Sequence, residues 1–198
     1  GKWYLVEARN DPALVARAKA NYELALALQP DLEEAVMVDG IYRWWVASDY
    51  VGAQALLAKA HALKPQDATP LFLAGLVHVS RGEWHAAVEP LHRGIELDPR
   101  DIETVSMLAG VYMALHRYAD AKPLAERAVS IDPTAVSALV ALAGLHQLDG
   151  DVAGMGRVLD AAPPSAHSNP DYVELRKDYL LYRRDYAGAR ALYSGLQP

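Results

Sequence analysis

The chain has 198 residues, 52% of them hydrophobic, and a formal net charge of −6. The hydrophobic share excludes a disordered chain, and the acidic balance argues against a protein that grips the phosphate backbone of nucleic acid, which needs a basic face. No stretch reaches the roughly eighteen consecutive apolar residues of a membrane span, and the absence of cysteine excludes disulfides, zinc–thiolate sites and thiol catalysis.

The origin of the chain leaves only weak marks on its sequence. It opens Gly-Lys-Trp-Tyr with no initiator Met and no apolar leader, so we expect an excised segment whose targeting signal lies elsewhere. The compartment, cytoplasm or periplasm, therefore stays open. Abundant Ala and a preference for Arg over Lys favour a bacterial source with a GC-rich genome.

The predicted elements alternate between two kinds of helix along the chain. Apolar residues at spacings of three, four and seven indicate amphipathic helices, and a proline ends most second helices. First helices are expected at 2–9, 33–46, 68–80, 102–115, 136–148 and 170–183. Second helices are expected at 12–28, 51–63, 84–97, 118–131, 152–161 and 186–196.

These helix pairs repeat with a fixed period. Tyr50, Trp84, Tyr118 and Tyr186 lie on a ladder with 34-residue steps, and Val152 fills the missing step. Small residues stand five and twelve places before each of four prolines; they are Ala18, Ala25, Ala53, Ala60, Ala87, Gly94, Ala121 and Ala128. Small side chains allow two helices to approach closely, so each period indicates a tightly packed helical hairpin.

A 34-residue helix–turn–helix with small, large and small positions before a proline resembles the tetratricopeptide repeat. Gly40 and Gly75 fall on the first-helix glycine of that pattern, whereas Gly110 and Gly144 sit one place later. The resemblance implies an all-α fold, an α-solenoid in which antiparallel hairpins form a right-handed superhelix. A single array of about six repeats is expected over 1–198, with approximate repeats 1–32, 33–67, 68–101, 102–135, 136–169 and 170–198.

Two features interrupt the pattern. Pro90 and Pro123 fall inside second helices, near the start of each as drawn above, and each removes one backbone hydrogen bond. We expect a small bend there and no break. The stretch 163–170 contains three prolines in place of the usual turn, which predicts a longer loop after a shortened helix.

No set of residues predicts catalysis, a metal site or a cofactor. His85 and His92 share a helix face, but no Asp, Glu or Cys completes a ligand set at short spacing. His78 and His146 occupy equivalent first-helix positions, where packing or a solvated surface explains them. Acidic residues gather at helix starts, where a carboxylate is stabilised. The sequence therefore predicts that the protein is not an enzyme.

The resemblance implies that first helices line a concave wall that binds extended peptides or helices of other proteins. By repeat register the wall residues are Met37, Ile41, Trp44, Phe72, Leu76, Val79, Met113, Val140, Gln147, Glu174, Asp178 and Tyr182. Ser106 belongs to the same register. Most of the set is apolar, which favours an apolar segment of a partner protein. Trp44 and Trp45 are adjacent, so one ring faces the groove or solvent, or both pack between hairpins.

Two functions follow from the resemblance. The first is a protein-interaction scaffold whose partner the sequence does not name. The alternative is a C-terminal regulatory segment of a larger bacterial signalling protein, such as a kinase, a cyclase or a transcription regulator. The outer face of the last hairpin, near Tyr193 and Leu196, has no polar capping helix. Either more chain follows it or this hairpin self-associates.

Overall fold

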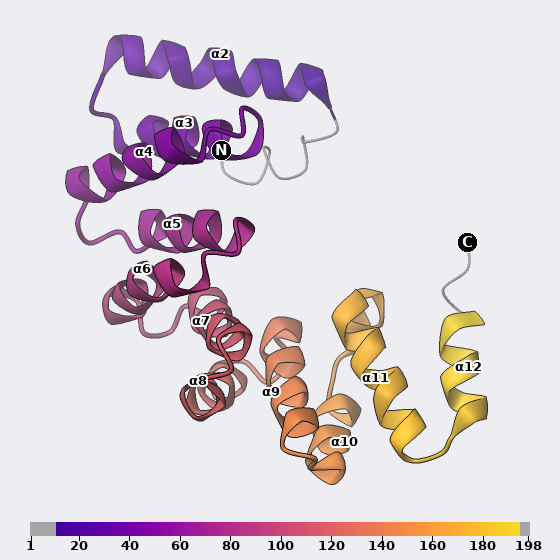
Figure 1. The fold of residues 1–198 in the computed structure, drawn as a ribbon. Coiled ribbons are helices and arrows are strands. Elements are labelled where there is room, and N and C mark those ends of the chain that lie inside the picture. Colours follow the sequence, from indigo (N-terminus) through magenta and orange to yellow (C-terminus); the bar gives the residue numbers. More distant parts are fainter. Residues whose placement is uncertain (1–10, 195–198) are drawn as a thin grey trace. The chain divides into compact units, whose positions relative to one another are not determined.

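The computed structural model describes residues 11–194 of the chain. Over this range it contains eleven α-helices, one short 3₁₀ helix and no strand (Figure 1). The chain divides into two units, residues 1–99 and 100–198, each of which is described by itself. The predicted all-helical fold of antiparallel hairpins is confirmed, whereas the division into six repeats and the right-handed superhelix stay predictions.

The first unit contains two complete hairpins and one further helix (Figure 1). Helices α3 (Glu33–Trp45) and α4 (Tyr50–Leu63) form one hairpin, and α5 (Thr69–Ser80) and α6 (Trp84–Leu97) form the next. Helix α2 (Pro12–Leu28) packs on α3, and α4 packs on α5. The helix predicted at 2–9, which would pair with α2, lies outside the described residues.

The second unit contains three hairpins. These are α7 (Ile102–Ala114) with α8 (Tyr118–Ile131), α9 (Val136–Leu148) with α10 (Val152–Asp160), and α11 (Pro170–Tyr182) with α12 (Tyr186–Ser194). Helix α9 also packs on α7, on α8 and on α11. The short α10 is followed by the 3₁₀ helix η2 (Pro164–Ser168), so the predicted shortened helix and longer loop are confirmed.

Small residues hold the two helices of each hairpin together. Ala53 and Ala60 of α4 are 0% exposed, and Leu57 between them is 1% exposed. Each second helix thus presents a flat surface with one large side chain, and the facing first helix comes close enough to bury it. Gly75 of α5 shows how close, because a Cβ built on it would lie 2.5 Å from Cδ2 of Leu91 in α6.

The turn inside each hairpin uses a left-handed residue and then a capping aspartate. Gly82 and Gly150 have φ of 71° in two of these turns, and Ser48, His116 and Arg184 have φ between 54° and 59° in three others. Asp49 accepts a hydrogen bond from the Gly52 backbone N–H at 2.9 Å, which satisfies a free donor of α4. The hydrogen bond from Gly52, and a second from Arg43, keep the pKa of Asp49 below its ordinary value.

The two internal prolines do not break their helices. Helix α6 runs through Pro90, and α8 runs through Pro123. The predicted continuity is therefore confirmed. The structure places both residues in the helix interior rather than near the helix start, so each lost backbone hydrogen bond is an interior one.

Candidate functional site

A groove of about 550 Å³ lies on the second unit, where one face of α7, one face of α9 and the start of α11 meet. Its residues recur at one register of the 34-residue period. The lining consists of Glu103, Ser106, Met107, Gly110, Met113, Ser137, Val140, Ala141, Gly144, Gln147, Leu148, Asn169, Asp171 and Leu175. Met113, Val140 and Gln147, which the sequence places on the binding wall, are brought together here, and Ser106 joins them.

The floor of the groove is open because two helices carry glycine at its centre. A Cβ built on Gly110 of α7 would meet no described atom within 4 Å beyond the neighbouring backbone of its own helix. A Cβ built on Gly144 of α9 would lie 3.2 Å from Cε of Met113, the flexible end of that side chain. The groove therefore owes its depth to missing side chains at these two positions.

One buried hydroxyl in the groove has no hydrogen-bond partner. Ser106 is 8% exposed, and its Oγ makes no hydrogen bond to any of the described residues. A buried polar group of this kind costs about 1–3 kcal/mol when unpaired. Ser106 Oγ is thus available to a polar group that enters the groove.

The ends of the groove are polar. Glu103 of α7 and Asp171 of α11 lie at the starts of their helices, and both are exposed. Toward the other end, the Gln147 amide Nε2 donates a hydrogen bond of 2.9 Å to Oδ2 of Asp178, which ties α9 to α11. Among the described residues that line the groove there is no Lys, Arg or His.

The remaining predicted residues of α11 lie beside the groove lining. Lys177 forms ion pairs with Glu174 and with Asp178, the second at 3.4 Å. Tyr182 is 56% exposed. The structure therefore joins Asp178 to the groove through Gln147 and leaves Glu174 and Tyr182 on the surface near it.

In the first unit the predicted wall residues are divided between core and surface. Met37 and Ile41 are 3% and 4% exposed and belong to the hydrophobic core around α3, α4 and α5. This corrects their expected position, because half-buried side chains such as Trp44 and Leu76 pack against the same core. Their side chains are not open to a partner. Phe72, Leu76 and Val79 are half-buried.

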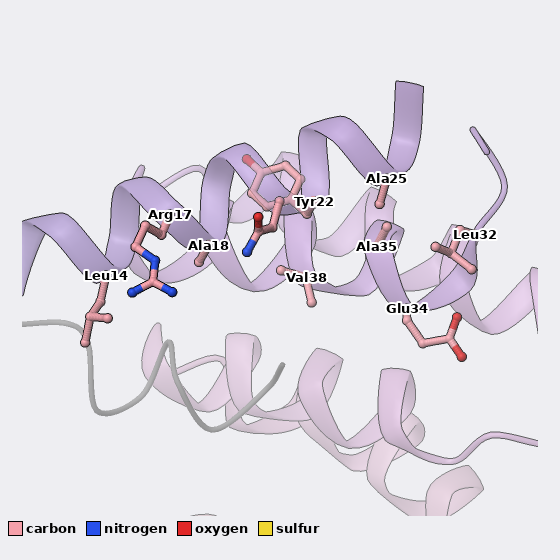
Figure 2. Close-up of a pocket in the computed structure, with 10 residues that line it drawn as sticks. Leu14, Arg17, Ala18, Tyr22, Ala25, Leu32, Glu34, Ala35 and Val38 are labelled. Atoms are coloured by element: carbon pink, nitrogen blue, oxygen red, sulfur yellow. The ribbon is translucent and has the colours of Figure 1, made fainter. Parts of the chain in front are cut away.

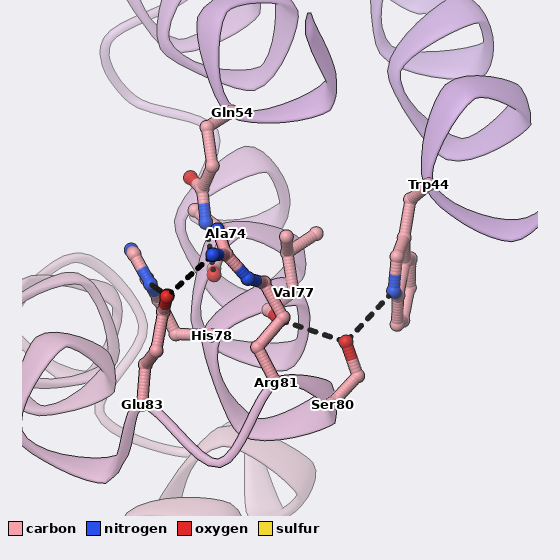
Figure 3. A network of polar contacts seen from close by, with 8 residues as sticks. All are labelled: Trp44, Gln54, Ala74, Val77, His78, Ser80, Arg81 and Glu83. Carbon is pink, nitrogen blue, oxygen red and sulfur yellow. Dashed lines mark hydrogen bonds and ion pairs between the residues drawn. The ribbon is translucent and has the colours of Figure 1, made fainter. Parts of the chain in front are cut away.

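Trp44 is held by a polar network at the end of α5 (Figure 3). Its Nε1 donates a hydrogen bond of 3.0 Å to Oγ of Ser80, and that hydroxyl donates to the Val77 carbonyl at 2.7 Å. The Trp44 and Trp45 rings are 5.2 Å apart, and both are half-buried. Both rings therefore contribute to packing while part of each stays accessible.

The equivalent histidines brace the turns of their hairpins. Nδ1 of His78 lies 2.8 Å from Oε2 of Glu83, which also receives Arg81 at 2.9 Å through its other oxygen (Figure 3). Nδ1 of His146 lies 3.0 Å from Oδ2 of Asp151 in the same way. These contacts fix the first helix to the start of the second, which agrees with the packing role predicted for both residues.

A second hollow, of about 660 Å³, lies between α2 and α3 (Figure 2). On the α2 side Leu14, Ala18, Tyr22 and Ala25 line it, and Figure 2 shows these side chains turned toward α3. Burial and the nearby Asp39 raise the pKa of Tyr22. The register is the one that α4 buries completely with Ala53, Leu57 and Ala60. The hollow is therefore an uncovered hairpin face, and the sequence did not predict it.

The described residues contain no group of three or more His, Cys, Asp or Glu that could hold a metal ion. Within the same residues, every helix is too short or too polar to cross a bilayer. The arrangement offers surfaces and hydrogen-bonding groups.

Taken together, the hairpins and their helix-lined groove define a helical-repeat protein. Known proteins refine that class. The profile of the family Anaphase-promoting complex, cyclosome, subunit 3 matches residues 47–123. No curated protein matches the sequence as a whole. Many solved structures match the fold.

Three solved structures illustrate the likeness. The structure of pilF from Pseudomonas aeruginosa has a TM-score of 0.81 at 17% identity, over 97% of this chain and 85% of that one. A tetratricopeptide repeat protein from Parabacteroides merdae has a TM-score of 0.73 at 17% identity, over 100% and 82%. YrrB, described as a tetratricopeptide protein with an unusual peptide-binding site, has a TM-score of 0.64 at 17% identity, over 86% and 88%. The chain is a tetratricopeptide-repeat protein, as its sequence predicts.

Proposed function

We propose that this chain is a protein-interaction scaffold that binds a segment of a partner protein in the groove formed by α7, α9 and α11. The observation that carries the proposal is the groove itself, with its apolar floor and its one unpartnered hydroxyl. Its volume of about 550 Å³ lies in the range of about 300–1,000 Å³ that is typical of ligand sites.

The chemistry of the lining supports a protein segment as the ligand. Met107 and Met113 are flexible, polarizable side chains that adapt to irregular apolar surfaces. Gly110 and Gly144 let a main chain approach the helices closely. A main-chain N–H or C=O arriving there would give Ser106 Oγ its missing hydrogen bond. Tetratricopeptide proteins in general serve as scaffolds rather than enzymes, and the peptide-binding site of YrrB shows that this fold can bind peptides.

The predicted residues of the first unit and of α11 extend the proposal. Trp44, Phe72, Leu76 and Val79 keep accessible apolar surface, and aromatic rings are frequent anchors in protein interfaces. Glu174, Asp178 and Tyr182 stand beside the groove of the second unit. We propose both sets as secondary contact residues, without Met37 and Ile41, which are buried in the core.

The test is to fill the groove without disturbing the fold. Leu76 of α5 stands 34 residues before Gly110 of α7, at the same register, so Gly110→Leu places in α7 a side chain that this helix type already carries. Peptides are first selected on the unaltered protein from an unbiased displayed library. We expect Gly110→Leu to weaken their binding by tenfold or more, because a Leu side chain displaces atoms of the ligand; about 1.4 kcal/mol corresponds to that factor.

The matched control is Ala119→Leu on α8, an exposed helical position outside the groove lining. This variant should bind the selected peptides as the unaltered protein does. Circular dichroism on all three proteins reports whether the helices are intact. If the library yields no binding peptide, or if Gly110→Leu binds the selected peptides normally, the proposal fails.

A further inference from the structure

The charges around the groove favour one sign of ligand. Glu103, Ser137 and Asp171 stand 34 residues apart and form one edge of the groove, at the starts of α7, α9 and α11. The two carboxylates are exposed, and no ion pair holds either of them among the described residues. The lining offers no cation to offset them.

The helix starts at this edge act in the opposite direction, so their magnitude must be weighed. A helix N-terminus carries about half a positive charge, and that partial charge attracts anions. At this edge, Asp101 caps α7 by accepting a hydrogen bond from the Glu103 backbone N–H at 3.2 Å, and Glu103 and Asp171 add two further full negative charges. The full charges exceed the three partial ones, so the edge is negative.

A row of apolar residues runs directly beside this edge. Met107, Ala141 and Leu175 are again 34 residues apart and lie on the same three helices. A Lys or Arg side chain suits this pair of rows, because its apolar stem can lie on the floor while its charged end reaches a carboxylate. An acidic side chain would lose its hydration there and meet like charge.

We infer that the occupant of the groove is a partner segment in which a Lys or Arg adjoins an apolar side chain. The basic group faces the edge formed by Glu103 and Asp171, and the apolar side chain lies on the row of Met107, Ala141 and Leu175. This inference rests on the proposed function and adds the charge of the ligand to it. Acidic segments are disfavoured at the same site.

The experiment compares three synthetic peptides that share one apolar Leu-Ile centre. The flanking residues are Lys in the first peptide, Ser in the second and Glu in the third, and fluorescence anisotropy at low salt measures their dissociation constants. We expect the Lys-flanked peptide to bind about tenfold more tightly than the Glu-flanked one. Added sodium chloride should shrink this difference, because salt screens exposed charges.

Two variants assign the preference to the groove. The double variant Glu103→Gln, Asp171→Asn should bind all three peptides within about twofold of one another, since the charges that discriminate are gone. The matched control Glu126→Gln removes an exposed carboxylate of α8 outside the groove and should keep the full preference. Circular dichroism checks that the double variant keeps its helices.

The outcomes separate the two proposals. If the three peptides bind the unaltered protein equally, and Gly110→Leu weakens all of them, the groove binds segments but the inference about charge is overturned. If the double variant still prefers Lys, the preference arises elsewhere and the inference is also overturned. If no peptide binds the unaltered protein, both proposals fail.

Discussion

The first-helix glycines occupy two different environments, although the sequence places all of them near one point of the repeat. Gly40 and Gly75 face the second helix of their own hairpin, where Leu57 and Leu91 press against them. Gly110 sits one position later, faces the open groove and meets nothing within 4 Å. A shift of one residue turns a helical side chain by about 100°, and this converts a packing glycine into a surface one.

This difference predicts opposite effects of the same substitution. Gly75→Ala should lower the free energy of unfolding by about 1–3 kcal/mol, because the new Cβ would lie 2.5 Å from Leu91, which is 0% exposed and closely packed. Gly110→Ala should raise it by about 0.5–1 kcal/mol, because Ala is the better helix former and no atom obstructs it. Urea unfolding followed by circular dichroism measures both. Equal shifts in one direction would contradict the two assigned environments.

The candidate groove was predictable from the sequence only in part. Met113, Val140 and Gln147 share a register, and register alone places side chains of successive repeats on one face. The burial of Met37 and Ile41 depends on how far side chains from neighbouring helices reach over them, which spacing does not encode. The depth at Gly110 likewise depends on a facing side chain being absent, whereas α5 has Leu76 at that register.

At the scale of elements, the helix boundaries could be predicted closely because local signals set them. The expected range 33–46 became Glu33–Trp45, and 118–131 became Tyr118–Ile131. Capping aspartates, left-handed turn residues and terminal prolines act within a few residues of the position they define. By contrast, the hollow between α2 and α3 depends on what covers a helix face, and no local signal reports that.

Pro123 offers a test of how a helix tolerates an interior proline. It lies inside α8 and its side chain is exposed, so it costs a backbone hydrogen bond without contributing buried packing. Pro123→Ala should therefore raise the free energy of unfolding by about 1–3 kcal/mol. Pro90→Ala is the informative comparison, because Pro90 is buried and its replacement also leaves a cavity. The gain at Pro90 should be smaller, and thermal unfolding would reveal the reverse order if burial did not matter.

At the scale of the whole molecule, one capping device recurs in both units. Asp49 accepts from the Gly52 N–H in the first unit, and Asp151 accepts from the Gly154 N–H at 2.8 Å in the second. In α11 the same bond is made by Asn169, which accepts from the Tyr172 N–H at 2.9 Å and does not titrate. Repeat proteins add up such local contributions along the chain, so a condition that weakens each cap destabilises every part of the array.

Acid is that condition, and the direction of its effect follows from the pKa values. The backbone hydrogen bond from Gly52 lowers the pKa of Asp49, and that from Gly154 lowers the pKa of Asp151, below the ordinary value of 3.8. A carboxyl group whose pKa is lower in the folded state stabilises that state above its ordinary pKa, and the stabilisation is lost as the pH falls toward the folded pKa. The unfolding midpoint in urea should therefore be level above about pH 5 and fall below pH 4.

Replacing both caps by Asn, as α11 already does, isolates their share of this acid limb. Asn caps a helix about as well as Asp does, so Asp49→Asn with Asp151→Asn should change the midpoint little at neutral pH. Some loss is expected there from the contacts of Asp49 with Arg43 and of Asp151 with His146. Below pH 4 the double variant should lose stability less steeply than the unaltered protein, because these two positions no longer take up protons on unfolding. If both proteins fall with the same slope, the acid sensitivity comes from other carboxylates, and the lowered pKa values of the caps do not govern the stability of the array.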